Sequence, residues 1–286
     1  MDVKDYSNLQ RVMQRFRRNR LAVIGALIIL LIVLMAIFAP LLAPYDPTEQ
    51  DYEALLLPPS WEHPFGTDDL GRDILSRIIY GSRYTLLVGI GVVLIVAVVG
   101  SLLGFIAGYY RGKLDTLIMR LVDVMLSVPV LVLALAISGA LGGGLINVII
   151  AIGAVGWTQF ARLVRGEVLH IRGTEYIKAA KALGANDFQI IFFHLAPNMV
   201  APVIVYTTLY IPSAILWAAS LSFLGLGVQP PIPEWGALIA DGRSYLSYAW
   251  WIATMPGLAI MLTVLGFNFM GDGLRDALDP KMAKDI

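Results

Sequence analysis

Long stretches without a charged side chain constrain this chain more than any other feature. They cover residues 21–43, 85–110, 124–161, 195–233 and 244–271. A helix needs about 20 apolar residues to cross the hydrocarbon core of a bilayer, and every stretch reaches that length. The chain is 58% hydrophobic and only 15% charged, whereas soluble domains carry about 25% charged residues. The pattern therefore predicts an all-α integral membrane protein.

The uncharged stretches predict six membrane-spanning helices. Three stretches have the length of one helix each. The stretch 124–161 is long enough for two helices, and the glycine triplet at 142–144 supplies a tight turn between them. In the stretch 195–233, we expect one helix over about 199–221, followed by a tail rich in Gly and Pro.

Basic residues are unevenly distributed around these helices. If the N-terminus lies in the cytosol, all 21 Lys and Arg fall on the cytosolic side except Arg72, Arg77, Arg83 and Arg243. Cytosolic loops of membrane proteins carry an excess of Lys and Arg. We therefore expect both termini and the polar segment 172–198 to be cytosolic.

The sequence offers no catalytic motif. Its three histidines form no His-Glu-x-x-His pattern, and it has no cysteine. A phosphate-binding loop ending at Gly112-Lys113 would need Gly at position 107 and Ser or Thr at 114, where Ala107 and Leu114 stand. We expect no catalytic residue, metal or cofactor in this chain, and no nucleic-acid partner. Energy from ATP would then come from a separate subunit.

Acidic residues lie near the predicted span ends rather than at mid-membrane. Asp123 follows Arg120 by three residues, and Asp272 precedes Arg275 by three, so we expect two interfacial ion pairs. A proton- or sodium-coupled carrier is expected to bury acids within its spans. This weakens, without removing, the alternatives of a self-sufficient carrier or channel; a membrane-embedded enzyme or structural anchor also stays open.

Two further features concern helix packing and the external segment. Gly100, Gly104 and Gly108 recur every four residues, which lets helices approach closely within one bundle or between two chains.

In the external segment 44–83, Thr67 or Asp68 is expected to cap an amphipathic helix over 73–82 that lies along the outer interface.

The polar segment 172–198 predicts two short helices joined at Gly184. We expect Thr174 to cap the first helix, Gly184 to end it with a positive φ, and Asp187 to cap the second. Pro197 is expected to start the next span. The small surface of the first helix favours a peg that fits a partner over an amphipathic helix lying on lipid.

This segment resembles the EAA loop of type I importer permeases of the ATP-binding cassette family. The match covers Ala179, Ala180, Gly184 and Pro197, while Lys178 stands where the family pattern has Glu. Similarity to C-type subunits of dipeptide, oligopeptide and nickel permeases extends over further blocks. These are residues 63–73, 221–227, 233–236 and 271–280.

The resemblance implies a six-helix permease with a MetI-like core in a bacterial or archaeal plasma membrane. It divides the chain into 1–83, a five-span core 84–273 with the coupling loop 172–198, and a tail 274–286. The implied partners are a B-type permease subunit, two cytosolic ATP-binding subunits, an external solute-binding protein and membrane lipid. Peptides are the implied cargo; nickel, glutathione and oligosaccharide remain alternatives.

The resemblance also assigns roles to residues. Contact with the ATPase is expected for Glu175, Tyr176, Ala179, Ala180, Leu183, Gly184, Ala185 and Pro197, with Glu175 supplying the acidic contact in place of position 178. Docking of the solute-binding protein is expected on the external segments. The candidate residues there are Asp68, Arg72, Asp73, Glu234 and Trp235.

Overall fold

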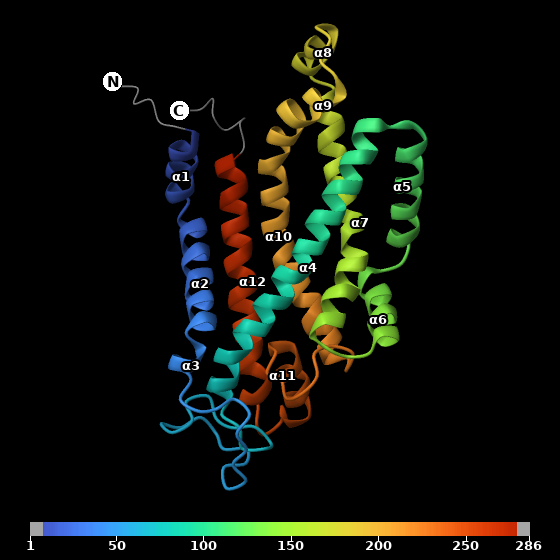
Figure 1. Cartoon of the computed structure of the whole chain (residues 1–286). Coiled ribbons are helices and arrows are strands. Elements are labelled where there is room, and N and C mark those ends of the chain that lie inside the picture. Colours follow the sequence, from blue (N-terminus) through green and yellow to red (C-terminus); the bar gives the residue numbers. More distant parts are fainter. Residues whose placement is uncertain (1–7, 279–286) are drawn as a thin grey trace, which may run out of the picture.

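A computed structural model describes residues 8–278, which form a bundle of long helices (Figure 1). The helices are α1 (Asn8–Arg18), α2 (Arg20–Ile37), α3 (Ala39–Leu42), α4 (Ile74–Tyr110), α5 (Gly112–Leu126), α6 (Val130–Leu141), α7 (Leu145–Arg172), α8 (Glu175–Ala182), α9 (Asp187–Gln189), α10 (Ala196–Phe223), α11 (Trp235–Gly242) and α12 (Trp251–Leu278). A π-helical turn, η1 (Ile190–Leu195), precedes α10, and a 3₁₀ turn, η2 (Arg243–Tyr245), follows α11.

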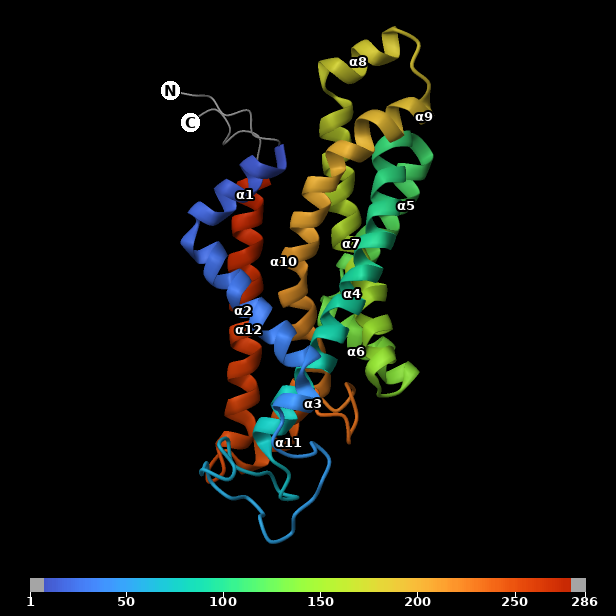
Figure 2. The same ribbon diagram turned by 60° about the vertical axis from the view of Figure 1, so that its left-hand side comes forward.

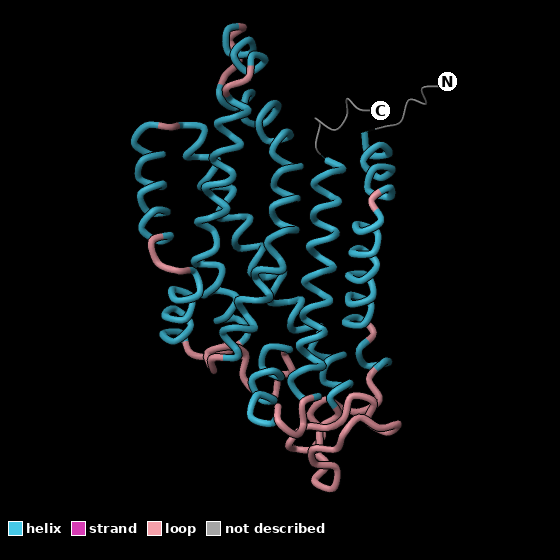
Figure 3. The backbone as a smooth tube through the Cα atoms, turned by 180° about the vertical axis from the view of Figure 1, so that it is seen from behind, coloured by secondary structure: helices cyan, strands magenta, loops and turns pink. Residues whose placement is uncertain are grey.

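The two ends of the bundle differ in character. At one end, α8 and α9 project beyond the other helices, and the start of α1 and the end of α12 lie at that same end (Figures 1 and 2). At the opposite end, α11 and long loops gather into a compact cap (Figure 3). The segment 172–198 therefore shares its end of the bundle with both ends of the described chain, as the charge distribution predicts.

Within residues 8–278, five helical segments are long and apolar enough to cross a membrane: α2, α4, α7, the run from α9 through α10, and α12. The pair α5–α6 makes a sixth if it counts as one span, although its two halves are bent by 88°. The predicted turn lies where expected, because α6 ends at Leu141 and α7 begins at Leu145. The predicted helix before that turn is wrong in its bounds. It starts earlier, at Gly112, and breaks before Pro129, which occupies the N-cap position of α6.

The second span is longer than predicted. Residues 74–82 do not form a separate helix on the outer interface; they are the first turns of α4, which continues to Tyr110. The N-cap is Asp73, whose carboxylate accepts a hydrogen bond from the backbone N–H of Ser76 at 2.7 Å, rather than Thr67 or Asp68. Ile74 and Ile78 are buried in the bundle. The boundary between residues 83 and 84 therefore falls inside one continuous helix.

The glycine stripe lies within the chain, against α7. A Cβ atom at Gly100 would lie 2.8 Å from the Cβ of Phe160, and one at Gly108 would lie 2.9 Å from the Cβ of Val168. A Cβ atom at Gly104 would lie closer still to the carbonyl oxygen of Ala161. These glycines permit the close crossing of α4 and α7 that forms the centre of the larger hydrophobic core.

A second core lies toward the capped end and joins α2, α4, α11 and α12. Its centre is the buried indole of Trp235, whose Nε1 donates to the carbonyl of Ile78 at 2.9 Å. The guanidinium of Arg83 donates to the carbonyls of Ala36 and Ile37, which are among the last carbonyls of α2. A cation at a helix C-terminus also interacts favourably with the helix dipole.

Ion pairs at the other end tie α5 to α7 and correct one expectation. Asp123 pairs with Arg162 of α7 instead of Arg120, its neighbour on the same helix. Asp115 pairs with Arg165 through both carboxylate oxygens, at 2.5 and 2.7 Å. Neither Asp272 nor Arg275 forms an ion pair within residues 8–278, so that second expected pair is also absent from the described part of the chain.

Candidate functional site

The segment 173–195 protrudes from the bundle, and it is called the projection below. It leaves α7 at its end, forms α8, turns back at Gly184, and returns through α9 and η1 into α10 (Figure 2). The buried side chain of Ile177 attaches α8 to the larger core, whereas Leu183 at the tip is 89% exposed. Leu183 therefore presents an apolar side chain at the tip of the projection, where another molecule could contact it.

Local interactions hold the projection in shape, with two differences from prediction. Gly184 has φ +89°, as expected for the residue that ends α8. Thr174 occupies the N-cap position, but its hydroxyl donates to the carbonyl of Ile171 and caps nothing. The second cap is Asn186, not Asp187: the Asn186 carboxamide accepts from the N–H of Gln189, and the Gln189 side chain accepts from the N–H of Asn186.

Asp187 has a different partner, which sequence reasoning missed. Its carboxylate accepts a hydrogen bond from the hydroxyl of Tyr109, a buried residue in the last turn of α4. Arg172 donates to the backbone carbonyl of Tyr109 at 2.6 Å, and the cations of Arg172 and Lys181 lie 5.4 and 5.6 Å from the centre of its ring. Tyr109 therefore joins α4 to both arms of the projection. In sequence it looks like one more interfacial aromatic residue at a span end.

The structure brings most of the predicted coupling residues to one surface. Glu175, Tyr176, Ala179, Leu183 and Gly184 are exposed on α8 and its tip, and Ala180 and Ala185 are partly exposed. Pro197 is also exposed, in the first turn of α10. Three aromatic residues that the prediction left out add to the exposed apolar surface: Phe188, Phe192 and Phe193. The rings of Phe188 and Phe192 pack together with their centres 4.5 Å apart.

The predicted docking residues at the capped end are buried, so their side chains do not contribute to the surface of this chain. Asp68 accepts from the side chains of Arg72 (2.7 Å) and Arg77 (2.8 Å), and all three are buried. Asp73 caps α4 and contacts His63 at 3.0 Å. Charged residues in an external segment were expected at the surface, but here they hold the loop together.

Glu234 and Trp235 are buried in the same cap. The carboxylate of Glu234 accepts from the backbone N–H groups of Gly236 and Ala237, at 3.0 and 3.1 Å, and from the hydroxyl of Ser222 at 3.0 Å. It thus caps α11 from inside the protein. Burial raises the pKa of Glu234, and these hydrogen bonds partly offset the rise.

The exposed surface of the cap is acidic and aromatic. Trp61 is fully exposed. The exposed acids in the same loop are Asp46, Glu49, Asp51, Glu53 and Glu62, and no Lys or Arg occurs between residues 44 and 71. Within residues 8–278, no group of three or more His, Cys, Asp or Glu side chains could hold a metal ion.

Two family profiles match the sequence of this chain. A family profile described as "Binding-protein-dependent transport system inner membrane component" matches residues 100–284, and one described as "N-terminal TM domain of oligopeptide transport permease C" matches residues 7–59. The division between these matches leaves the first span outside the larger family region.

Curated relatives match nearly the full chain. The di/tripeptide transport system permease protein DppC of Pseudomonas aeruginosa is 50% identical over 96% of this chain and 93% of its own length. The dipeptide permease DppC of Alkalihalophilus pseudofirmus is 50% identical, covering 94% and 88%. The glutathione permease GsiD of Pectobacterium atrosepticum is 47% identical, covering 94% and 90%.

Among solved structures, the inward-facing MetNI methionine ABC transporter contains a chain with the same fold. It aligns with a TM-score of 0.60 at 19% identity, over 72% of this chain and 98% of that chain. The expected MetI-like core is thereby confirmed as a fold.

Proposed function

This chain belongs to the family of binding-protein-dependent transport system inner membrane components, and from that premise we propose that it is one permease subunit of an ATP-driven peptide importer. Relatives of this length that transport dipeptides and tripeptides support peptides as the cargo. Glutathione is the second candidate, because a relative of nearly equal identity carries that name.

The exposed tip of the projection is the observation that carries the proposal. Leu183 and Phe188 present apolar side chains beyond the end of the bundle, next to the polar residues Glu175 and Lys178. Exposed apolar patches rimmed by polar residues mark protein contacts. We assign this surface to a cytosolic ATP-binding subunit, with a B-type permease forming the other half of the pathway and engaging a second ATPase.

The internal contacts of the projection suit it to transmit force. Ile177 fixes α8 in the core, and Tyr109 ties both arms to α4. A push on the tip would therefore move α4, α7 and α10 together as rigid elements instead of bending a loose loop. Closure of the ATPase pair would switch the bundle from inward-facing to outward-facing, a rigid-body transition between two packed states.

The opposite end of the bundle then faces the solute-binding protein. Because the five residues predicted for docking are buried, we assign docking to the exposed acidic and aromatic residues of the loop that contains Trp61. The ion pair between Asp68 and Arg77 joins that loop to the first turns of α4.

The experiment that tests the proposal is reconstitution of the two permeases with their ATPases and binding protein, comparing Leu183→Ser with wild type. We expect Leu183→Ser to reduce peptide uptake and peptide-stimulated ATP hydrolysis by about tenfold, since an apolar anchor in a protein pocket contributes 1–2 kcal/mol or more. The matched control is Leu114→Ser, an exposed leucine at the same end of the bundle but on α5. Unchanged stimulation in Leu183→Ser, or equal loss in both variants, would contradict the proposal. Competition of labelled dipeptide uptake by glutathione decides between the two cargoes.

A further inference from the structure

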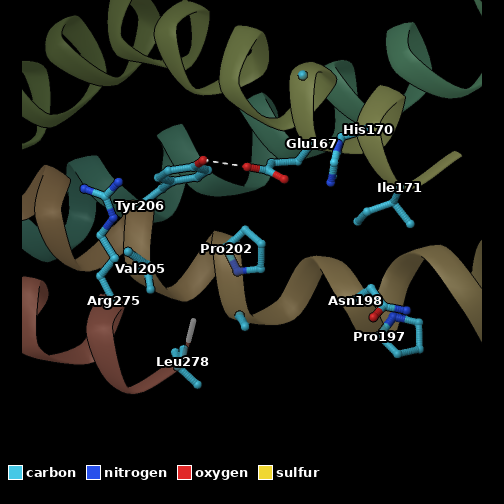
Figure 4. A pocket seen from close by; sticks show the side chains of 12 residues that line it. Glu167, His170, Ile171, Pro197, Asn198, Pro202, Val205, Tyr206, Arg275 and Leu278 are labelled. Carbon is cyan, nitrogen blue, oxygen red and sulfur yellow. Dashed lines mark hydrogen bonds between the residues drawn. The ribbon is translucent and has the colours of Figure 1, made fainter. Parts of the chain in front are cut away.

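A cleft of about 710 Å³ opens beside the projection, and of the residues expected to contact the ATPase it includes Pro197 alone. Its walls come from the end of α7, the first turns of α10 and the last turns of α12 (Figure 4). The volume lies within the range of about 300–1,000 Å³ that is usual for small-ligand sites.

The cleft holds one anionic and one cationic group that do not neutralise each other. Glu167 of α7 accepts a hydrogen bond from the hydroxyl of Tyr206 through Oε1, at 2.9 Å, and its Oε2 has no hydrogen-bond partner in the described chain. Arg275 of α12 lies on the other side of the Tyr206 ring (Figure 4). Its guanidinium is exposed and forms no ion pair within residues 8–278.

The remaining walls divide into polar and apolar parts. His170 and Asn198 lie toward the projection, and Pro202 and Val205 form an apolar floor on α10 (Figure 4). A simple anion would meet the carboxylate of Glu167, and a simple cation would meet the guanidinium of Arg275. A molecule that carries both charges and a short apolar part satisfies all the groups at once.

We propose that this cleft binds a small zwitterion, with its ammonium group at Glu167 and its carboxylate or phosphate at Arg275. A guanidinium suits this role because it can donate two parallel hydrogen bonds to either anion. Two sources carry this chemistry: a free peptide on the side from which cargo is released, and the phosphoethanolamine headgroup of a membrane lipid. The site rests on its own geometry, and it depends on the proposed function only for naming peptide as one source.

The peptide arm of the test uses the assembled importer in nanodiscs of phosphatidylcholine and the dipeptide Ala-Ala as the probe. Saturation-transfer NMR, which detects weak binding, would compare Ala-Ala with its N-acetylated and its C-terminally amidated form. We expect Arg275→Gln and Glu167→Gln each to weaken Ala-Ala binding by about tenfold. Arg275→Gln should also remove the preference for a free carboxylate, and Glu167→Gln the preference for a free amine.

The lipid arm uses native mass spectrometry of the same complexes from an equimolar mixture of phosphatidylethanolamine and phosphatidylcholine. Selective retention of phosphatidylethanolamine by wild type, lost in Arg275→Gln and Glu167→Gln, identifies the headgroup as the occupant. Glu167→Gln keeps a carbonyl acceptor for Tyr206, so its fold should survive, and thermal unfolding verifies this. The control variants are Lys113→Gln and Asp272→Asn, which change exposed charges at the same end of the bundle.

Binding of either probe that depends on both residues supports the proposal, and the arm in which it appears names the source. The proposal is overturned if neither probe binds, or if binding is the same in Arg275→Gln, Glu167→Gln and the controls. Peptide uptake is measured in parallel. A wild-type complex that imports peptide but binds neither probe would refute the zwitterion site and leave the importer function standing.

Discussion

The hydroxyl of Tyr109 donates a hydrogen bond to the carboxylate of Asp187, and this contact joins the end of α4 to the returning arm of the projection. At its other end, the same helix begins in the cap, where Asp73 is its N-cap and Arg77 contacts Asp68. The 37 residues of α4 span about 55 Å at 1.5 Å per residue. One continuous helix thus connects the proposed ATPase surface with the proposed docking surface.

Tyr109→Phe removes the hydroxyl that reaches Asp187 and keeps the ring. Loss of one hydrogen bond to a charged group costs about 1.5–3 kcal/mol locally. We expect faster amide exchange in residues 183–190, by tenfold or more, and weaker stimulation of ATP hydrolysis by loaded binding protein. Tyr110→Phe is the matched control, because the Tyr110 hydroxyl has no hydrogen bond within the described chain. Equal exchange in the two variants would show that the contact does not order the projection.

Gly184 is the position where the backbone of the projection takes a left-handed conformation, with φ +89°. No atom lies within 4 Å of a Cβ placed there, so a substitution acts through the backbone alone. Gly184→Val should cost about 1–2 kcal/mol and reduce coupled uptake, because a β-branched residue disfavours positive φ. Gly184→Asn should retain most uptake, since Asn tolerates this region. Similar uptake in the two variants would mean that the turn geometry is not needed for coupling.

Asp68 forms ion pairs with two buried guanidinium groups in the cap, those of Arg72 and Arg77. Removing one partner of a buried ion pair typically costs about 3–5 kcal/mol, because the remaining charges stay buried. Asp68→Asn should therefore lower the thermal unfolding midpoint of the purified chain by several degrees. Glu53→Gln, an exposed change in the same loop, should leave it within a degree. A stable Asp68→Asn variant would show that the cap does not depend on this network.

The uncharged stretches predicted most of the helices, and the misses in the cap and at α5 share one physical cause. Charged residues are expected at the surface when only the sequence is known, but inside the cap Asp68 pairs with both Arg72 and Arg77. The pairing joins the loop to the first turns of α4. Because charged residues were expected at the surface, the first turns of α4 were predicted as a separate helix. For the same reason, buried charged residues were predicted to dock a second protein. The α5 helix was also mislocated, because Asp115 and Asp123 are paired by arginines of α7.

The helix ends of the projection were easier to predict, because single Gly and Pro residues in the local sequence determine them. Gly184 ends α8 with the positive φ expected of it, and Pro197 lies in the first turn of α10. The contacts of Tyr109 were beyond prediction, since the residue lies 78 positions from Asp187 in the chain. No local pattern reports a hydrogen bond at that separation.

Glu234 gives the stability of the cap a defined pH dependence. Burial raises its folded-state pKa above the unfolded value, so the folded state binds more protons in the interval between the two. Its contribution to stability is therefore fully present below the unfolded pKa and is lost as pH rises through the folded pKa. Glu234→Gln removes this titration. The difference in unfolding midpoint, wild type minus variant, should fall as pH rises from about 4, near the unfolded pKa of Glu. A difference that rises with pH would contradict this assignment.

Accessibility of position 183 tests the central claim, that the projection docks on a cytosolic ATPase, most directly. The chain has no cysteine, so Leu183→Cys introduces a unique thiol. Its labelling by a membrane-impermeant maleimide would be followed in inside-out vesicles, with and without the ATPase subunits, beside Leu114→Cys as the control. We predict rapid labelling of Leu183→Cys that slows at least tenfold when the ATPases are bound, with little change at Leu114→Cys. Labelling of Leu183→Cys only from the outer face, or at the same rate with and without ATPase, would contradict the claim.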